Sequence, residues 1–400
     1  MPNSPSSPWG SAARRNGVTM RSRTRRQGDG GENKNRESYT VRRCPATAGL
    51  MLRAEAGPSA HTPDVACAAC AGLPKKDCPK DCDNMPHVTL RDGARMHYWD
   101  IGRGPACVLL HGFGMHAWMW LPFVAPLALR NRFILPDLRG FGGSHLLPIR
   151  KANALEQHAD DLEDLLTALD LDQPALAGLS MGACTSLEYQ RRYGFDRVSG
   201  YLNIDNPPCV TGKAGWPWGL FGERHHEFRG ELRELIADLG EHAPYTPFHE
   251  LPKKLRGRMW QQLARFGADA VENRGLQKLF SLGRFEPLIK RLAGTGQWRV
   301  YIDIMRTYAE LDHDWRDSVG RTQGKIFRVF AGTHSKMYPI EGQMAFARYV
   351  PDVEIVRFDG AGHCVQFDSP ALFTRELGRF LDDVHRRPAR VAAEPQRRRA

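Results

Sequence analysis

The sequence predicts an α/β protein with a doubly wound, mostly parallel sheet and a helical cap inserted into it. Short apolar runs alternate with amphipathic helical stretches from about residue 85 to 385, which is typical of a parallel sheet covered by helices. Between about residues 207 and 323 the strand signals stop and helical stretches dominate. The 400 residues suffice for a large domain with an insertion. The predicted units are a basic extension (1–84), the first part of the core (85–206), the cap (207–323), the second part of the core (324–385) and a basic tail (386–400).

The formal charge of +11 is concentrated at the two ends of the chain. Residues 1–84 carry 14 Lys and Arg against 8 Asp and Glu, and residues 386–400 carry 6 Arg against one Glu, so residues 85–385 are neutral. A basic tail can bind polyanions, but short arginine runs are more often solvated chain ends. We therefore do not expect nucleic acid to be the main partner.

The extension is rich in Pro, Gly, Ser, Asn and Arg and has no sustained hydrophobic period, so it is predicted to be disordered. One pattern within it suggests chemistry. Cys67, Cys70, Cys78 and Cys82 supply four thiols that could close on zinc. The loop between the two pairs is shorter than in common zinc modules and carries no apolar residues, so a flexible segment with four thiols is the favoured interpretation.

No stretch of 18 residues is uniformly apolar, so no membrane span is expected. The N-terminus also lacks the apolar segment of a secretory signal. Cysteines in the neutral region do not have the spacing of a disulfide framework, which favours a reducing compartment. These are Cys107, Cys184, Cys209 and Cys364. Together these features predict a cytoplasmic protein.

The folded part is predicted to begin at about Met85 with a hairpin, because Val88–Leu90 and Met96–Trp99 flank an Asp92-Gly93 turn. Further short apolar runs are expected to be buried strands of a mostly parallel sheet. They are Ala106–Leu110, Phe133–Pro136, Ala175–Leu179, Gly200–Ile204, Ile326–Ala331 and Val353–Val356.

Two helices of the core have an apolar stripe. The first carries leucines at positions 162, 165, 166 and 169, the spacing of one helix face. The last carries Leu377, Phe380, Leu381 and Val384 in the same pattern and is predicted to begin at Pro370.

The predicted cap contains helical stretches at Glu231–Leu239 and Lys254–Phe266. An insertion that emerges where strands end is expected to lie over a site. Its aromatic residues could line an acyl pocket, although most of them are expected to form the core of the cap. They are Trp216, Trp218, Phe221, Phe228, Trp260 and Trp298.

The strongest chemical signal is Gly178-Leu179-Ser180-Met181-Gly182, between a predicted buried strand and a helical run. In a G-x-S-x-G turn of this kind, strained backbone lifts the serine hydroxyl out of the sheet, and the glycines leave room where strand and helix nearly collide. The context predicts that Ser180 is a nucleophile rather than an incidental serine in a glycine-containing turn.

Three further motifs, with this one, resemble the α/β-hydrolase superfamily over about residues 86–385. They are His111-Gly112-Phe113-Gly114 after a strand, Asp137-Leu138-Arg139-Gly140-Phe141-Gly142-Gly143-Ser144, and Gly360-Ala361-Gly362-His363. By this resemblance the backbone N–H groups of Phe113 and Met181 form an oxyanion hole. Asp137 and Arg139 are expected to order their loop rather than to react.

The resemblance also makes His363 the general base, a role that suits a neutral imidazole. The usual acid follows the penultimate strand in this superfamily, but Gly332-Thr333-His334 is followed by Ser335, which cannot supply a negative charge. Some members place the acid one strand earlier, and that position here is Asp205. Asp205 could instead only order the turn at Pro207 and Pro208. Asp312 and Asp314 are the weaker candidates.

A serine nucleophile implies an acyl-enzyme, so the expected activity is hydrolysis of carboxylic esters of small or medium apolar substrates. A thioesterase, a lactonase or an acyltransferase would use the same residues, and a degenerate site that only binds a ligand is the alternative from another class. Trp118 and Trp216 are the predicted substrate contacts. The expected partner is a small acyl molecule, and the chemistry requires no metal and no cofactor.

Overall fold

The computed structural model describes residues 86–240, 242, 246–281, 298–322 and 324–386. The predicted four-cysteine pattern at residues 67–82 and nearly all of the basic tail lie outside these ranges. Within the described part of the chain, no helix is both long and apolar enough to cross a membrane.

The sheet has eight strands in the order β1-β2-β4-β3-β5-β6-β7-β8. Their bounds are His87–Thr89 (β1), Arg95–Gly102 (β2), Ala106–Leu110 (β3), Arg132–Pro136 (β4), Ala175–Leu179 (β5), Gly200–Ile204 (β6), Ile326–Gly332 (β7) and Glu354–Phe358 (β8). Strand β2 pairs antiparallel with β1 and β4, and all other neighbours are parallel. The predicted fold class is therefore confirmed, and every strand that the apolar runs predicted is present.

Helices cover both faces of the sheet. Successive residues of β6 face opposite sides of the sheet. On one side, the Tyr201 hydroxyl donates to the carbonyl of Ala183 in α3 (Met181–Tyr193), at 3.3 Å. On the other side, Gly200 lies directly against Val384 of α12 (Pro370–Arg386). A Cβ atom built on Gly200 would lie only 2.5 Å from the Val384 side chain. Helix α2 (Ala154–Ala168) packs beside α3, and α1 (Leu121–Val124) beside α12.

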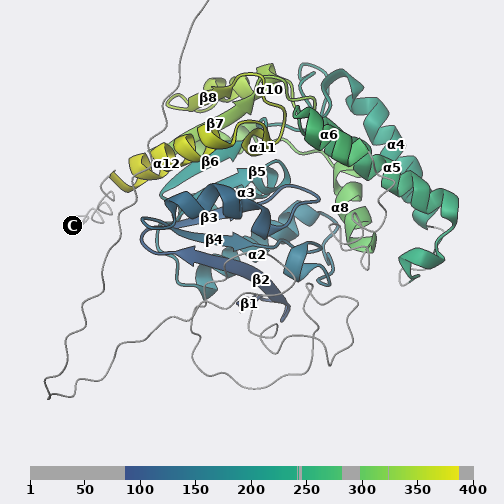
Figure 1. The fold of residues 1–400 in the computed structure, drawn as a ribbon, viewed down its shortest axis with the longest axis horizontal. Coiled ribbons are helices and arrows are strands. Elements are labelled where there is room, and N and C mark those ends of the chain that lie inside the picture. Colours follow the sequence, from purple (N-terminus) through teal and green to yellow (C-terminus); the bar gives the residue numbers. More distant parts are fainter. Residues whose placement is uncertain (1–85, 241, 243–245, 282–297, 323, 387–400) are drawn as a thin grey trace, which may run out of the picture. The chain divides into compact units, whose positions relative to one another are not determined.

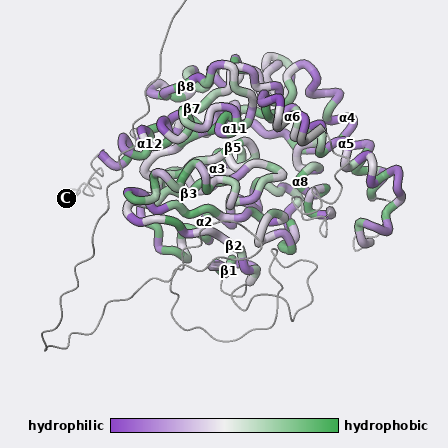
Figure 2. The backbone as a smooth tube through the Cα atoms, viewed as in Figure 1, coloured by the Kyte–Doolittle hydropathy of each residue, from purple (hydrophilic) through white to green (hydrophobic). Residues whose placement is uncertain are grey.

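Four longer helices lie between β6 and β7 in the sequence and gather beside the sheet, at the right in Figure 1. They are α4 (His225–Gly240), α5 (Lys253–Asp269), α6 (Arg274–Ser281) and α8 (Trp298–Glu310), here named the insertion helices. Apolar side chains of α4, α5 and α8 form a core of their own, which includes Leu232, Leu235, Leu255, Met259, Trp298 and Ile302. Figure 2 shows the hydrophobic residues running along the central strands, whereas α4 and α5 alternate between hydrophobic and hydrophilic residues.

Short helices complete the described chain. They are α9 (Arg316–Val319), α10 (Ile340–Met344) and α11 (Val365–Asp368). Helix α10 follows the loop after β7, and α11 follows the loop after β8. These two loops carry the remaining residues of the candidate site.

Candidate active site

Ser180 lies in a sharp turn between β5 and α3. Its backbone has φ 53° and ψ −114°, a conformation that L-residues rarely adopt outside strained sites. A Cβ on Gly178 would lie 2.4 Å from the Gly182 carbonyl oxygen, and one on Gly182 would lie 2.6 Å from the Leu110 carbonyl oxygen. Strand and helix therefore approach so closely that only glycine fits on either side of the serine.

Asp205 follows β6 directly, and both of its carboxylate oxygens are fully engaged. Its Oδ1 accepts from the backbone N–H of Gly332 at 2.8 Å and from Nε2 of Gln343 at 2.9 Å. Its Oδ2 accepts from the Ser335 hydroxyl at 2.7 Å and lies 2.6 Å from Nδ1 of His363. A carboxylate only accepts hydrogen bonds, so Nδ1 is the donor in the last contact. The carboxylate is completely buried, and its four donors replace the lost water.

His363 follows β8 and is also buried. Because Nδ1 donates to Asp205, the unprotonated nitrogen of the neutral imidazole is Nε2. A general base requires this tautomer. The ring centroid of Tyr338 lies 5.6 Å from that of His363, and Tyr338 and Ser180 line the same cavity. Ser180, Asp205 and His363 thus follow the carboxyl ends of β5, β6 and β8, three parallel strands of the sheet.

Phe113 and Met181 line the same cavity as the serine. Met181 is the first residue of α3, so its N–H belongs to the helix terminus that has no partner within the helix. The loop that carries Phe113 passes close by, because a Cβ on Gly112 would lie 3.5 Å from Cβ of Ser180. The backbone of the Phe113 loop and the N-terminus of α3 therefore both lie close to Ser180.

A cavity of about 560 Å³, partly open to solvent, lies next to the serine. Ser180, Gln262, Tyr308 and Tyr338 are the polar residues in its lining. The other lining residues are apolar and come mostly from the insertion helices: Phe113, Met181, Leu220, Phe228, Leu232, Leu263, Phe266 and Met305. A cavity of this size and composition suits a small ligand with an apolar part.

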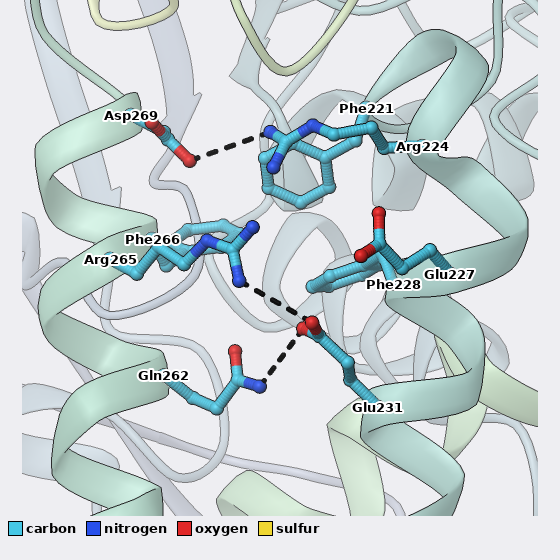
Figure 3. A pocket seen from close by; sticks show the side chains of 9 residues that line it. All are labelled: Phe221, Arg224, Glu227, Phe228, Glu231, Gln262, Arg265, Phe266 and Asp269. Atoms are coloured by element: carbon cyan, nitrogen blue, oxygen red, sulfur yellow. Dashed lines mark hydrogen bonds and ion pairs between the residues drawn. The ribbon is translucent and has the colours of Figure 1, made fainter.

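A second, charged pocket lies between α4 and α5 and shares Phe228, Gln262 and Phe266 with the cavity. Figure 3 shows how polar side chains cross it. Glu231 accepts from Nε2 of Gln262 at 3.2 Å and pairs with Arg265 at 3.4 Å, while other ion pairs, such as that of Arg224 with Asp269, lie nearby. The three shared residues are the wall between the charged surface and the apolar cavity.

The loop after β4 is ordered by buried ion pairs, as predicted for Asp137 and Arg139. Asp137 accepts from His97 at 2.7 Å and from the backbone N–H groups of Ala117 and Gly143 at 2.7 and 2.9 Å. Burial raises the pKa of Asp137, and its bonds with His97 outweigh this, so its pKa is lowered overall. Arg139 forms two hydrogen bonds with Asp161.

His111 has a structural environment. Its Nδ1 lies 2.8 Å from the Gly112 carbonyl, and its Nε2 accepts from the Leu138 N–H at 3.0 Å. Complete burial lowers the pKa of His111 to about 4, so the ring is neutral near pH 7. The histidine thus fixes the start of the loop that carries Phe113.

The two predicted tryptophan contacts do not lie in the cavity. Trp216 is buried in a separate cluster with Cys209 and Ala345, and its indole N–H donates to the Cys209 carbonyl at 2.8 Å. Trp118 lies on the short helix after the Phe113 loop and is 45% exposed. Neither residue is among those that line the cavity beside Ser180. Phe228 is the aromatic residue among the predicted set that lines it.

The alternative acids are occupied elsewhere. Asp312 pairs with Arg229 at the surface, and Asp314 pairs with Lys213 and Arg316. Hydrogen bonds from Arg316 and Lys213 outweigh the effect of partial burial and lower the pKa of Asp314. Among the described residues, neither carboxylate contacts His363, and no group of three or more His, Cys, Asp or Glu side chains is arranged to hold a metal ion.

Sequence reasoning missed Gln343, Tyr308 and Tyr338. Gln343 lies on α10 and reaches Asp205 across a sequence separation of 138 residues. Tyr338 follows Ser335 by three residues, so its place in the loop after β7 was the one signal that could have indicated it. Tyr308 lies on α8, and the sequence alone did not indicate that this helix contacts the core of the sheet.

Comparison with known proteins identifies the family of this chain and several relatives. A family model described as the alpha/beta hydrolase family matches residues 107–376. An uncharacterized protein of Mycobacterium bovis is 32% identical over 302 residues, which cover 72% of this chain and 79% of that protein. A non-heme chloroperoxidase of Kitasatospora aureofaciens is 34% identical over 131 residues, which cover 32% of this chain and 47% of that protein. The chain spans about half the length of several curated relatives that it matches.

Solved structures share the fold. An esterase from Thermogutta terrifontis covers 75% of this chain and 99% of its own length, with a TM-score of 0.56 and 23% sequence identity. The likeness at this identity concerns the fold alone. The family model spans more than half of the sequence, and the chain therefore belongs to the alpha/beta hydrolase family.

Proposed function

We propose that this protein is a serine hydrolase that cleaves a carboxylic ester through an acyl-enzyme. The observation that carries the proposal is the 2.6 Å contact between Nδ1 of His363 and the fully satisfied carboxylate of Asp205, next to a serine in a strained turn. An Asp–His pair of this kind holds the imidazole in the tautomer that accepts the serine proton. The esterase with the same fold is consistent with this activity.

The reaction follows from the positions of these groups. The Ser180 oxygen attacks the ester carbonyl carbon while its proton moves to Nε2 of His363, and Asp205 stabilises the imidazolium. The carbonyl oxygen becomes an oxyanion between the N–H groups of Phe113 and Met181. The intermediate then collapses: the bond to the alkoxy oxygen breaks, and His363 returns the proton to the departing alcohol. Water, activated by the same histidine, attacks the acyl-enzyme and releases the acid.

The insertion helices supply most of the acyl pocket in this proposal. Apolar side chains from α4 and α5, including Phe228, Leu263 and Phe266, line the cavity next to the nucleophile. Burial of a hydrocarbon chain there contributes about 0.8 kcal/mol per methylene. We therefore propose that these helices act as a cap that selects acyl groups of small or medium length.

Covalent labelling tests the proposal. A fluorophosphonate probe is expected to label the protein at Ser180 and to block hydrolysis of p-nitrophenyl esters, because the probe forms a stable phosphonyl ester with an activated serine. Ser180→Ala is expected to abolish both labelling and hydrolysis. Ser186→Ala is the matched control, since this buried serine on the same helix donates to the Gly182 carbonyl at 2.8 Å and is not among the residues that line the cavity. If the wild-type protein takes no label and cleaves no ester, the site binds a ligand without catalysis and the proposal is wrong.

A further inference from the structure

Two phenol groups lie in the otherwise apolar cavity beside the nucleophile. Tyr308 comes from α8 and Tyr338 from the loop after β7, so separate elements bring them to the same lining. Gln262, the other polar residue there besides Ser180, is already bonded to Glu231. Burial raises the pKa of both phenols well above the usual value, so each keeps its proton and remains a hydrogen-bond donor.

Both hydroxyls share a weak partner, the thiol of Cys184. Cys184 lies one turn after Ser180 on α3, and its thiol donates to Oδ1 of Asn206 at 3.3 Å. Burial raises the pKa of this thiol to about 12, so it stays protonated. Tyr308 and Tyr338 each interact electrostatically with this thiol, and Tyr338 also interacts with Ser180. A thiol sulfur is a poor acceptor, and a substrate oxygen would satisfy these donors better.

The acyl group is expected to extend into the cavity that the phenols line. The described lining of the cavity includes Ser180, Phe113 and Met181 but does not include His363. The departing alcohol must lie next to His363, which returns its proton, so the group that stays on Ser180 extends into the cavity. Since Tyr338 lines the same cavity as Ser180 and interacts with it electrostatically, we place an oxygen that meets these hydroxyls within two or three bonds of the reacting carbonyl carbon.

Resting on the proposed ester hydrolysis, we infer that Tyr308 and Tyr338 form a binding site for an oxygen on carbon 2 or 3 of the acyl chain. The substrate class is then a hydroxyacyl or oxoacyl ester with an apolar tail. The oxygen accepts from the phenols, and the tail contacts the apolar side chains of α4 and α5. A purely aliphatic acyl chain offers these two phenol donors no oxygen acceptor, and this is the basis of the preference.

Methyl esters that differ by one oxygen test the inference. We would measure kcat/KM by pH-stat for methyl 3-hydroxyhexanoate, methyl 2-hydroxyhexanoate and methyl hexanoate. The wild-type protein is expected to prefer at least one oxygenated ester over methyl hexanoate by about tenfold or more. The ratio of the uncatalysed alkaline hydrolysis rates of the same esters gives their intrinsic difference in reactivity. Tyr308→Phe and Tyr338→Phe each remove only a hydroxyl group, so each is expected to lower the enzymatic ratio toward this intrinsic ratio.

Tyr189→Phe is the matched control, because it removes a buried phenol that bonds to Glu163 far from the cavity lining. It is expected to keep the wild-type ratio, and thermal melting would show that each variant is folded. The inference is overturned if the wild-type ratio is close to the ratio for alkaline hydrolysis. It is also overturned if the wild-type ratio is high but neither Tyr308→Phe nor Tyr338→Phe reduces it. A protein that cleaves none of the three esters overturns it as well. The proposed function fails separately, if fluorophosphonate does not label Ser180.

Discussion

The carboxylate of Asp205 is fixed in place before any substrate arrives. Its donors come from the end of β7, the following loop, α10 and the loop after β8, so four segments hold one side chain. Such a network keeps the charge buried at little cost and leaves no freedom for the carboxylate to turn away from His363. If Asp205 is the acid that orients His363, removal of its charge should strongly reduce activity.

Asp205→Asn is expected to lower kcat for ester hydrolysis by about 10³–10⁴-fold, because an amide favours the wrong imidazole tautomer and cannot stabilise the imidazolium. Steady-state assays with p-nitrophenyl butyrate would measure this. Asp312→Asn is the control, since the Asp312 side chain is 65% exposed and pairs only with Arg229. The assignment of the acid fails if Asp205→Asn retains most of the wild-type activity.

The sequence contained Asp205 and Ser335 as separate clues, and the structure joins them. The family resemblance indicated that the usual acid position holds serine, and a displaced acid was inferred from chain order and strand ends. What could not be predicted is that the Ser335 hydroxyl donates to Asp205 at 2.7 Å, because this contact joins residues 130 positions apart. The serine at the usual acid position thus supports the carboxylate at the earlier one.

At the scale of elements, local patterns predicted the sheet well. The runs at residues 106–110, 175–179 and 200–204 coincide with β3, β5 and β6, because buried parallel strands are continuous apolar segments bounded by turn residues. The apolar spacing also predicted α2 and α12. The orientation of the insertion helices could not be predicted, because it depends on long-range packing such as that of Phe113 against Phe266 and Tyr301.

The turn between β5 and α3 gives a prediction about glycine. Gly182→Ala is expected to destabilise the fold by about 3 kcal/mol, because the new Cβ would lie 2.6 Å from a backbone carbonyl that cannot move without disturbing β3. Gly257→Ala is the matched control: it lies in α5 with no atom within 4 Å of its Cβ position, and it should stabilise by up to about 1 kcal/mol. Urea denaturation of both variants measures the difference, and equal effects would contradict the close approach.

The wall between the cavity and the charged pocket gives a second prediction at this scale. Phe266 lines both and packs its ring against Phe113, at 5.6 Å between centroids. Phe266→Ala is expected to lengthen the acyl pocket, so that the ratio of kcat/KM for methyl dodecanoate to that for methyl hexanoate rises by about tenfold.

Phe248→Ala separates pocket shape from loss of stability. Phe248 belongs to the core of the insertion helices and packs against Trp260, at 5.5 Å between ring centroids, but it does not line the cavity. This variant is expected to lower the melting temperature and leave the chain-length ratio unchanged. The cap proposal is contradicted if both variants change the ratio alike, or if Phe266→Ala does not change it.

For the molecule as a whole, charge and pH couple to folding through buried histidines. His111 is held neutral by burial, with a pKa of about 4 against about 6.5 in the unfolded chain. The unfolded state therefore binds more protons between these two values. The stability that this neutral histidine contributes is complete above pH about 6.5 and is lost as the pH falls toward about 4.

The expected loss from this one group is about 2 kcal/mol at pH about 5, measured as the free energy of unfolding in urea relative to neutral pH. Protonation would place a second N–H against the Leu138 N–H, which now donates to Nε2 at 3.0 Å. His111→Gln cannot titrate, so its stability, although lower at neutral pH, is expected to fall less steeply over the same range. His249→Gln is the control, because the His249 side chain is 76% exposed and should leave the wild-type slope unchanged. If His111→Gln and the wild type lose stability in parallel, the loss of stability between these pH values arises from other buried groups. The loop that carries Phe113 then does not depend on a neutral His111.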